Sequence, residues 1–259
     1  MTRLRFGTFN LLHGISVSDG QVREADLTAA GAALDADVVG LQEVDRDQPR
    51  SGKVDQTAVV ADALEATWWR FAPSVEGTPG ESWEPADPYR PELLAGPGYG
   101  VGLVSRLEVL EWRATAFPAA PFGMPLLVPN RGLVHVPDEP RAVLAAVVVG
   151  PDGPFTVATA HLSFVPGWNV WQLRRLARWL APLPRPWLVL GDLNLPGALP
   201  QATTRWRRLA RVPTYPSWRP RVQWDHALTT GTAAPRVVAV RAERLAVSDH
   251  CALLVDVDW

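Results

Sequence analysis

The sequence has almost no cysteine, no excess of basic charge and no long apolar run, and each absence excludes a class of protein. Its 259 residues include one cysteine, Cys251. An intrachain disulfide scaffold and a zinc site built on several thiolates are therefore excluded. The formal net charge of −2 and the pI of about 6.2 argue against bulk electrostatic attraction to nucleic acid, since basic nucleic-acid binders lie above a pI of about 9. No apolar run approaches the ~20 residues that span a bilayer.

The first residues, MTRLRFGTFNLLHG, also lack the apolar segment and cleavage site of a signal peptide. Together with the low cysteine content, this predicts a cytoplasmic protein with no membrane span, and we expect a monomer. A hydrophobic share of 47% and a charged share of 20% suit a folded core. At about 150 residues per domain, the length allows one large domain or two small ones.

Strand and helix signals alternate in the first part of the chain. Residues 4–9 and 37–44 have strand patterns, whereas residues 24–34 and 56–66 have helical ones. Short strands follow at 100–104, 107–112, 142–149 and 155–160, then a helix at 168–180 and strands at 187–190, 221–228, 236–240 and 252–257. Neighbouring strands without helices between them indicate hairpins. The prediction is an α/β fold of the α+β type with mixed sheets.

Many of the 25 prolines lie in two stretches, residues 79–98 and 117–140. Both are too broken by proline for regular structure to be expected. Loops of this length are often functional. They are candidate substrate-shaping loops or plain surface excursions.

Polar residues that can bind metal or transfer protons stand where apolar strands end. They are Asn10, Glu43, His161, Asp192, Asn194, Asp225, Asp249 and His250. An unpaired buried carboxylate is costly, so such groups belong at strand ends that face a cleft. We expect these segments to converge on one site.

Several catalytic motifs are absent, which narrows the chemistry of that site. The chain has no GxxxxGK[ST] loop, no HExxH helix and no GxSxG elbow. The remaining carboxylates and carboxamides are hard oxygen ligands, which favour Mg²⁺, with Mn²⁺ as the alternative. Histidine adds an acid or base that titrates near neutral pH. This combination is typical of phosphate-ester chemistry.

The sequence resembles the endonuclease/exonuclease/phosphatase superfamily, which includes deoxyribonuclease I. The matching blocks, in family order, are TFNLLHG at 8–14, DVVGLQEVD at 37–45, GYGVGLVSR at 98–106, ATAHL at 158–162, LVLGDLNL at 188–195, QWDHAL at 223–228 and VSDH at 247–250. The resemblance implies one domain over residues 1–259. It further implies a four-layered sandwich of two mixed β-sheets flanked by helices, with a cleft at one edge.

The resemblance also implies a metal site. Glu43 corresponds to the principal Mg²⁺ ligand, Asn10 lies beside the metal, and Asp249 is a further metal or supporting carboxylate.

The remaining motif residues correspond to catalytic groups. By the resemblance, Asp192 and Asn194 lie under the scissile phosphate, and their i, i+2 spacing at a strand end is expected to put both side chains on one face. His250 corresponds to the general base, oriented by Asp225. His161 corresponds to a group that either hydrogen-bonds the phosphoryl oxygen or protonates the leaving group.

Three further features have two readings each. Arg141 is a candidate phosphate-binding residue or a solvated strand end, and His13 is a candidate substrate contact or a loop histidine bonded to backbone. Residues 205–221 hold six arginines with Trp206, Tyr215 and Trp218. They form either a stacking and phosphate-binding surface or a solvated helix face with the tryptophans packed inward.

The prediction is a Mg²⁺-dependent hydrolase of phosphoester bonds, a phosphodiesterase or phosphatase, that acts on a small-molecule or lipid-derived substrate. The alternatives are a nuclease acting on DNA or RNA and, from another class, a non-catalytic binding module. Leu12 stands where abasic-site endonucleases of the superfamily have an acidic residue, which disfavours that activity.

Overall fold

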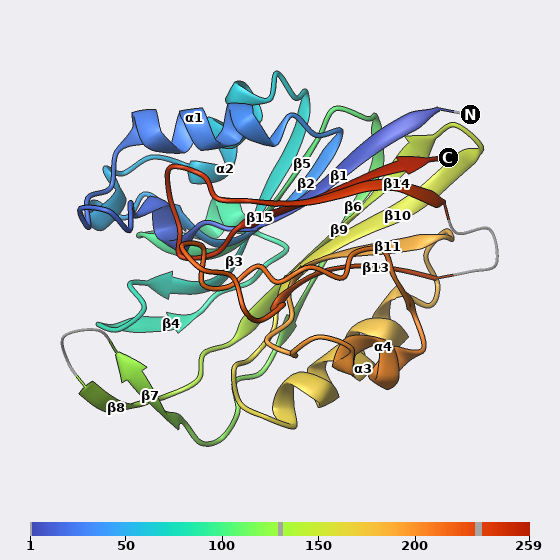
Figure 1. Cartoon of the computed structure of the whole chain (residues 1–259). Helices are drawn as coiled ribbons and strands as arrows, with labels where there is room; N and C mark the ends of the chain where they lie inside the picture. The colour runs from blue at the N-terminus through green and yellow to red at the C-terminus, as the bar shows by residue number, and fades with distance from the viewer. Residues whose placement is uncertain (1, 129–131, 231–234) are drawn as a thin grey trace.

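The strands form two mixed sheets in a computed structural model that describes residues 2–128, 132–230 and 235–259 (Figure 1). The first sheet has the strand order β14-β15-β1-β2-β5-β3-β4. Its strands are β1 (Arg3–Asn10), β2 (Val38–Arg46), β3 (Trp68–Gly77), β4 (Trp83–Pro85), β5 (Gly98–Ser105), β14 (Arg236–Glu243) and β15 (Ala252–Asp258). The second has the order β12-β13-β11-β10-β9-β6. Its strands are β6 (Val109–Phe117), β9 (Arg141–Gly150), β10 (Gly153–His161), β11 (Trp187–Asp192), β12 (Arg207–Arg208) and β13 (Asp225–Thr229).

Helices cover the outer faces of both sheets. Side chains of α1 (Glu24–Leu34) and α2 (Gln56–Ala63) share a buried apolar cluster with β1 and β2. Side chains of α3 (Trp168–Leu180) pack in the same way on the second sheet, with α4 (Leu199–Thr204) beside α3. A third cluster, which includes Phe6 and Val157, lies between the sheets. The four-layered sandwich predicted from the sequence is therefore confirmed. Within the described residues, none of the helices has the length and apolar content needed to cross a membrane.

Parallel pairing places the ends of β1, β10 and β11 at one edge of the sandwich. β1 pairs with β2 and β10 pairs with β11 in parallel, whereas the other pairs in the two sheets are antiparallel. Asn10 ends β1, His161 ends β10 and Asp192 ends β11. Their positions follow from strand direction, because the carboxyl ends of parallel neighbours meet at the same edge.

The two sheets approach closely near this edge. A Cβ on Gly40 would lie 2.6 Å from Oγ1 of Thr159, so only glycine fits there. Two residues further along β2, the Gln42 amide donates to Thr159 Oγ1 at 2.9 Å, and Thr8 donates to Gln42 Oε1 at 3.2 Å. The Gln42–Thr159 hydrogen bond connects the two sheets beside the cluster of strand ends, and the Thr8 bond holds the Gln42 amide within the first sheet.

Most of the regular elements agree with the sequence patterns, with several differences. The helices at 24–34 and 168–180 are confirmed, whereas the helix predicted over 56–66 ends at Ala63. The strand predicted over 221–228 begins only at Asp225, and β3 has no counterpart in the prediction.

The prediction that both proline-rich stretches lack regular structure was wrong. Residues 79–98 contain β4 and a 3-10 turn at Pro91–Leu93. Residues 117–140 contain a hairpin of β7 (Met124–Val128) and β8 (Gly132–Val136), which lies apart from the two main sheets in Figure 1. Residues 129–131 of this stretch are outside the described residues. Pro125 is tolerated in β7 because both strands of an isolated hairpin are edge strands.

Candidate active site

A pocket of about 600 Å³ opens at the edge where β10 and β11 end. Its lining includes Glu43, Arg141, His161, Asp192, Asn194, Asp249 and His250 from the predicted set. The rest of its lining is Tyr99, Val136, Pro137, Glu139, Phe164, Tyr215 and Trp224. Residues from distant parts of the chain thus share one concave site.

Glu43 reaches the pocket from an irregularity in β2. The pairing of β2 with β5 shifts register between Leu41 and Val44, and Glu43 has a φ of 52°. A bulge of this kind redirects a side chain relative to regular strand alternation. Burial raises the pKa of the Glu43 carboxyl to about 7, against the opposing effect of a hydrogen bond from Asn10. Among the described residues, Glu43 forms no ion pair with a cationic side chain.

Asn10 connects carboxylates that come from different sheets. Its Nδ2 donates to Glu43 Oε1 at 2.9 Å and to Asp192 Oδ2 at 3.2 Å. Its Oδ1 accepts the backbone N–H of Leu12 at 3.0 Å. In this arrangement the amide nitrogen, rather than the oxygen, faces the two acids.

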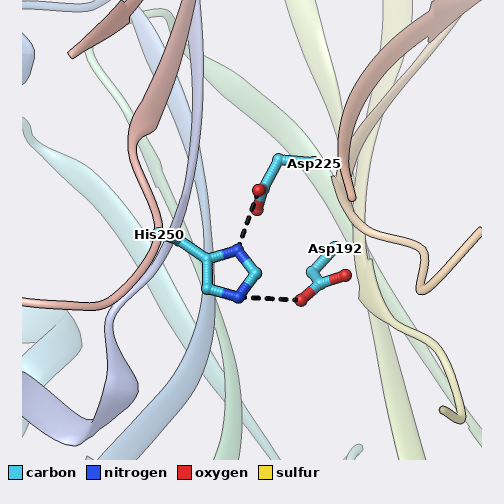
Figure 2. Close-up of side chains that lie close together, drawn as sticks. All are labelled: Asp192, Asp225 and His250. Carbon is cyan, nitrogen blue, oxygen red and sulfur yellow. Dashed lines mark hydrogen bonds and ion pairs between the residues drawn. The ribbon is translucent and has the colours of Figure 1, made fainter. Parts of the chain in front are cut away.

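His250 forms a buried pair with Asp225, and Figure 2 shows its ring between Asp225 and Asp192. Nδ1 lies 2.8 Å from Asp225 Oδ2, and Nε2 lies 3.7 Å from Asp192 Oδ2. Burial by itself lowers the pKa of His250, but the charge and hydrogen bond of Asp225 outweigh it, and with Asp192 and Asp249 they raise the pKa to about 10. The ring is protonated at neutral pH in this state.

Ser248 is a supporting residue that sequence reasoning did not identify. It adopts a φ of 78°, its Oγ accepts the backbone N–H of His250 at 3.0 Å, and it donates to the backbone oxygen of Asn10 at 2.6 Å. The hydroxyl thus links the end of β1 to the turn that carries His250. The position of Ser248 directly before Asp249 and His250 is the sequence feature that could have identified it.

Unlike His250, His161 is uncharged. Its Nε2 lies 3.2 Å from Asn194 Nδ2 and 3.7 Å from Asp192 Oδ2. Burial, followed by the positive charge of Arg141, lowers the pKa of His161 to about 3. The ring is therefore neutral at pH 7.

Asn194 does not reach the pocket by the strand alternation expected from its spacing to Asp192. β11 ends at Asp192, and Asn194 has a φ of 49°, which rotates the chain out of the strand. Its amide then donates to Leu162 O at 2.9 Å as well as contacting His161, while its backbone N–H donates to Asp192 Oδ1 at 3.0 Å. The turn, rather than a shared strand face, brings the two side chains together.

Carboxylates converge on the pocket in excess of cations. Burial raises the pKa of Asp249, although the charge of His250 opposes the shift. Ligand atoms of Asp192, Asp225 and His250 all lie within 4.8 Å of one another. Asp225 and His250 of this group already hydrogen-bond each other at 2.8 Å, which leaves Asp192 as its unpaired acid for a divalent cation.

Arg141, the first residue of β9, is buried in the pocket wall. It forms ion pairs with Asp138 at 2.9 Å and Glu139 at 3.2 Å. Its buried Nε has no hydrogen-bond partner among the described residues. Of the described residues that line the pocket, it is the one arginine, and its guanidinium brings a positive charge to that wall.

His13 is not brought to the pocket lining. It lies in the 3-10 turn Leu12–Gly14 with a φ of 43°, and its backbone oxygen accepts from Gln56 Nε2 at 2.8 Å. Burial, then the charge of Arg50, lowers its pKa to about 4. Its role as a substrate contact stays a prediction.

Aromatic walls of the pocket were not identified from the sequence. They are Tyr99, Phe164, Tyr215 and Trp224, and the Tyr215 ring centroid lies 4.9 Å from that of His250. Tyr215 lies in the arginine-rich stretch 205–221, which is loop and the short strand β12 rather than the helix considered above. In it Trp206 is buried and Trp218 is 55% exposed, so neither reading holds for the whole stretch.

Comparisons with known proteins agree with this geometry. The sequence model of the endonuclease/exonuclease/phosphatase family matches residues 7–250. No curated protein matches the chain. An endonuclease/exonuclease/phosphatase from Beutenbergia cavernae has a similar structure with a TM-score of 0.68 and 24% identity, over 100% of this chain and 72% of that one.

One other similar structure is named as a phosphatase, and another is described as a complex with DNA. A mannosyl-6-phosphatase from Bacteroides thetaiotaomicron has a TM-score of 0.65 and 15% identity, over 99% of this chain and 100% of that chain. D. rerio TDP2 complexed with a single-strand DNA product has a TM-score of 0.60 and 17% identity, over 100% of both chains. These identities show a shared fold. The family-model match over residues 7–250 shows that the chain belongs to the endonuclease/exonuclease/phosphatase family of phosphoester hydrolases.

Proposed function

We propose that the protein is a Mg²⁺-dependent phosphodiesterase or phosphatase that acts on a small-molecule or lipid-derived substrate through in-line attack by water. The observation that carries the proposal is the placement of the His250–Asp225 pair beside Asp192, in the same pocket as Glu43 and Asp249. A base, a metal-binding set of acids and a substrate cavity are thus adjacent.

The carboxylates of Glu43, Asp192 and Asp249 fit Mg²⁺. The pKa values of Glu43 and Asp249 are both raised by burial, and the negative charge of Asp192 adds to both shifts. Such mutually repelling oxygens are stabilised by a hard divalent cation. When bound, the cation would neutralise these acids, lower the pKa of His250 toward neutrality and polarise a phosphoryl oxygen. Glu43, Asp192 and Asp249 would hold it, and Asn10 would orient the first two.

In its neutral form, His250 would act as the base that accepts a proton from water at Nε2. Asp225 holds Nδ1 at 2.8 Å, which fixes the ring and stabilises its protonated form. His161 is neutral and faces Asn194, which suits a hydrogen bond to a phosphoryl oxygen better than proton donation to a leaving group. The Arg141 guanidinium in the pocket wall adds a positive charge for phosphate.

The pocket itself favours a small or lipid-derived ester. Val136, Pro137 and Glu139 of the second proline-rich stretch form part of its wall, and its volume of about 600 Å³ suits a ligand of modest size. Its lining contains more acids than arginines, which disfavours a long polyanion. The nuclease alternative rests on the arginine-rich stretch 205–221, where Trp218 is exposed.

Hydrolysis of soluble model esters tests the proposal. We expect purified protein with Mg²⁺ to cleave bis-p-nitrophenyl phosphate or p-nitrophenyl phosphate, and chelation by EDTA to abolish the reaction. The preferred ester separates a phosphodiesterase from a phosphatase. Absence of cleavage of both esters, with Mg²⁺ and with Mn²⁺, would contradict the assignment.

A further inference from the structure

The β7–β8 hairpin carries exposed apolar side chains at the mouth of the pocket. Its described residues pair with neither main sheet, and β8 ends at Val136, which lines the pocket wall with Pro137. Between residues 118 and 137 the sequence has one charged residue, Arg131. Among the described side chains, Leu133 is 73% exposed and Phe122 is 59% exposed. Exposed apolar groups gathered next to a ligand site mark a contact surface.

The start of α3 continues this surface. Trp168 Nε1 donates to Pro118 O at 3.0 Å, at the base of the segment that carries the hairpin. The rings of Trp168 and Trp171 stack with centroids 4.7 Å apart. The Arg175 guanidinium lies 5.4 Å from the Trp171 ring centroid and 5.6 Å from that of Phe117. Aromatic rings and arginine therefore adjoin the apolar hairpin.

The same part of the chain is strongly basic, although the whole chain has a net charge of −2. Residues 162–182, which include α3, hold Arg174, Arg175 and Arg178 and no acidic residue. Across the described ranges, none of these arginines forms an ion pair. Arg174 and Arg175 are exposed on α3, so they are available to an anionic partner.

We propose that this surface docks on an anionic lipid bilayer with the pocket mouth facing the membrane. The docking face consists of Phe122, Leu133, Trp168, Trp171, Arg174 and Arg175. Leu133 and Phe122 enter the acyl boundary, the tryptophans lie at the headgroup level, and the arginines attract anionic headgroups. Docking on the bilayer does not depend on the proposed function. Entry of a lipid headgroup ester into the pocket rests on that function.

The apolar hairpin distinguishes a bilayer from a nucleic acid as the partner. Nucleic-acid surfaces combine cations for phosphates with aromatic rings for bases. A leucine exposed to 73% supplies neither, and the stretch around it has only Arg131 as a charge. A bilayer uses both parts of the face, since it offers an apolar interior and an anionic surface.

Sedimentation with vesicles tests the docking. We expect the full chain to sediment with phosphatidylcholine vesicles that contain about a third phosphatidylserine, and to bind pure phosphatidylcholine at least about tenfold more weakly. The double variants Phe122→Ser/Leu133→Ser and Arg174→Gln/Arg175→Gln should each lower binding to the anionic vesicles about tenfold or more. Both should hydrolyse the soluble esters like the wild type, which also shows that they fold.

Matched controls lie away from the docking face. Leu110→Ser alters a leucine exposed to 54% on β6, and Arg3→Gln/Arg185→Gln removes two charges at the opposite end of the sheets. Wild-type levels of vesicle binding are expected for both.

Absence of vesicle binding by the wild-type protein, or an equal loss of binding in the control variants, overturns the proposal. Binding of a single-stranded oligonucleotide in place of vesicles, lost in Arg174→Gln/Arg175→Gln, overturns it in favour of nucleic acid. Ester hydrolysis without vesicle binding would contradict the docking and support the proposed function. Vesicle binding without ester hydrolysis would support the docking and contradict the proposed function.

Discussion

The Nε2 atoms of His161 and His250 both lie 3.7 Å from the same oxygen, Oδ2 of Asp192, yet the two rings hold different charges. His250 is paired with Asp225, and its pKa is about 10. Among the described residues, no hydrogen-bond partner contacts Nδ1 of His161, and burial together with the charge of Arg141 lowers its pKa to about 3. One carboxylate therefore lies between a protonated and a neutral imidazole, which gives the two histidines separate roles.

The pH dependence of stability should reveal the His250–Asp225 pair. The pKa of His250 rises from 6.5 to about 10 on folding, so the folded state holds the proton more tightly. Its contribution is complete below pH 6.5 and is lost as the pH rises through about 10. In urea unfolding with EDTA, the difference in free energy of unfolding between wild type and His250→Gln should shrink over that window. Parallel curves for the two proteins would show that the pair does not stabilise the fold.

Metal affinity should depend on the protonation of Glu43. Because its pKa is raised to about 7, protons compete with the cation, and Mg²⁺ affinity should fall by up to about tenfold per pH unit below neutrality. Titration calorimetry of Glu43→Gln should show much weaker binding without this pH dependence. Glu108→Gln, which changes an exposed acid, is the control and should bind like the wild type.

Esters with different leaving groups distinguish the two roles considered for His161, a hydrogen bond to a phosphoryl oxygen and protonation of the leaving group. If the neutral ring hydrogen-bonds a phosphoryl oxygen, His161→Ala should slow esters with good and poor leaving groups by the same factor, about 100-fold. A kcat comparison of p-nitrophenyl and phenyl esters measures this. A much larger loss for the phenyl ester would assign His161 as the acid that protonates the leaving group.

Close packing of the sheets at Gly40 should be sensitive to one methyl group. An added Cβ would lie 2.6 Å from Thr159 Oγ1 and 2.8 Å from its Cβ, so Gly40→Ala should destabilise the protein by about 1–3 kcal/mol. Denaturant unfolding measures the change. Gly96→Ala, whose Cβ would meet only Glu76 Oε1 at 3.6 Å, serves as the control and should be close to neutral. Equal stability of both variants would show that the sheets can separate locally without cost.

Local patterns in the sequence were sufficient for much of the fold. Helix-forming residues predicted the helix at 24–34, and apolar spacing predicted the helix at 168–180, because one face of the latter is buried. It did not predict β3, whose residues WWRFAPSVEG lack regular alternation and include Pro73. Proline also concealed the β7–β8 hairpin, since isolated edge strands tolerate a residue that interior strands exclude.

The amino-acid sequence by itself determined which polar groups stand at strand ends, and the family resemblance supplied the roles that remain predictions. Only the tertiary structure decided their contacts. Asn10 bonds to Asp192 across 182 positions because the two sheets pack face to face. Glu43 and Asn194 face the pocket because φ values of 52° and 49° rotate them out of strand alternation. A local pattern cannot encode such contacts, since they depend on the packing of distant segments and on backbone turns that this packing stabilises.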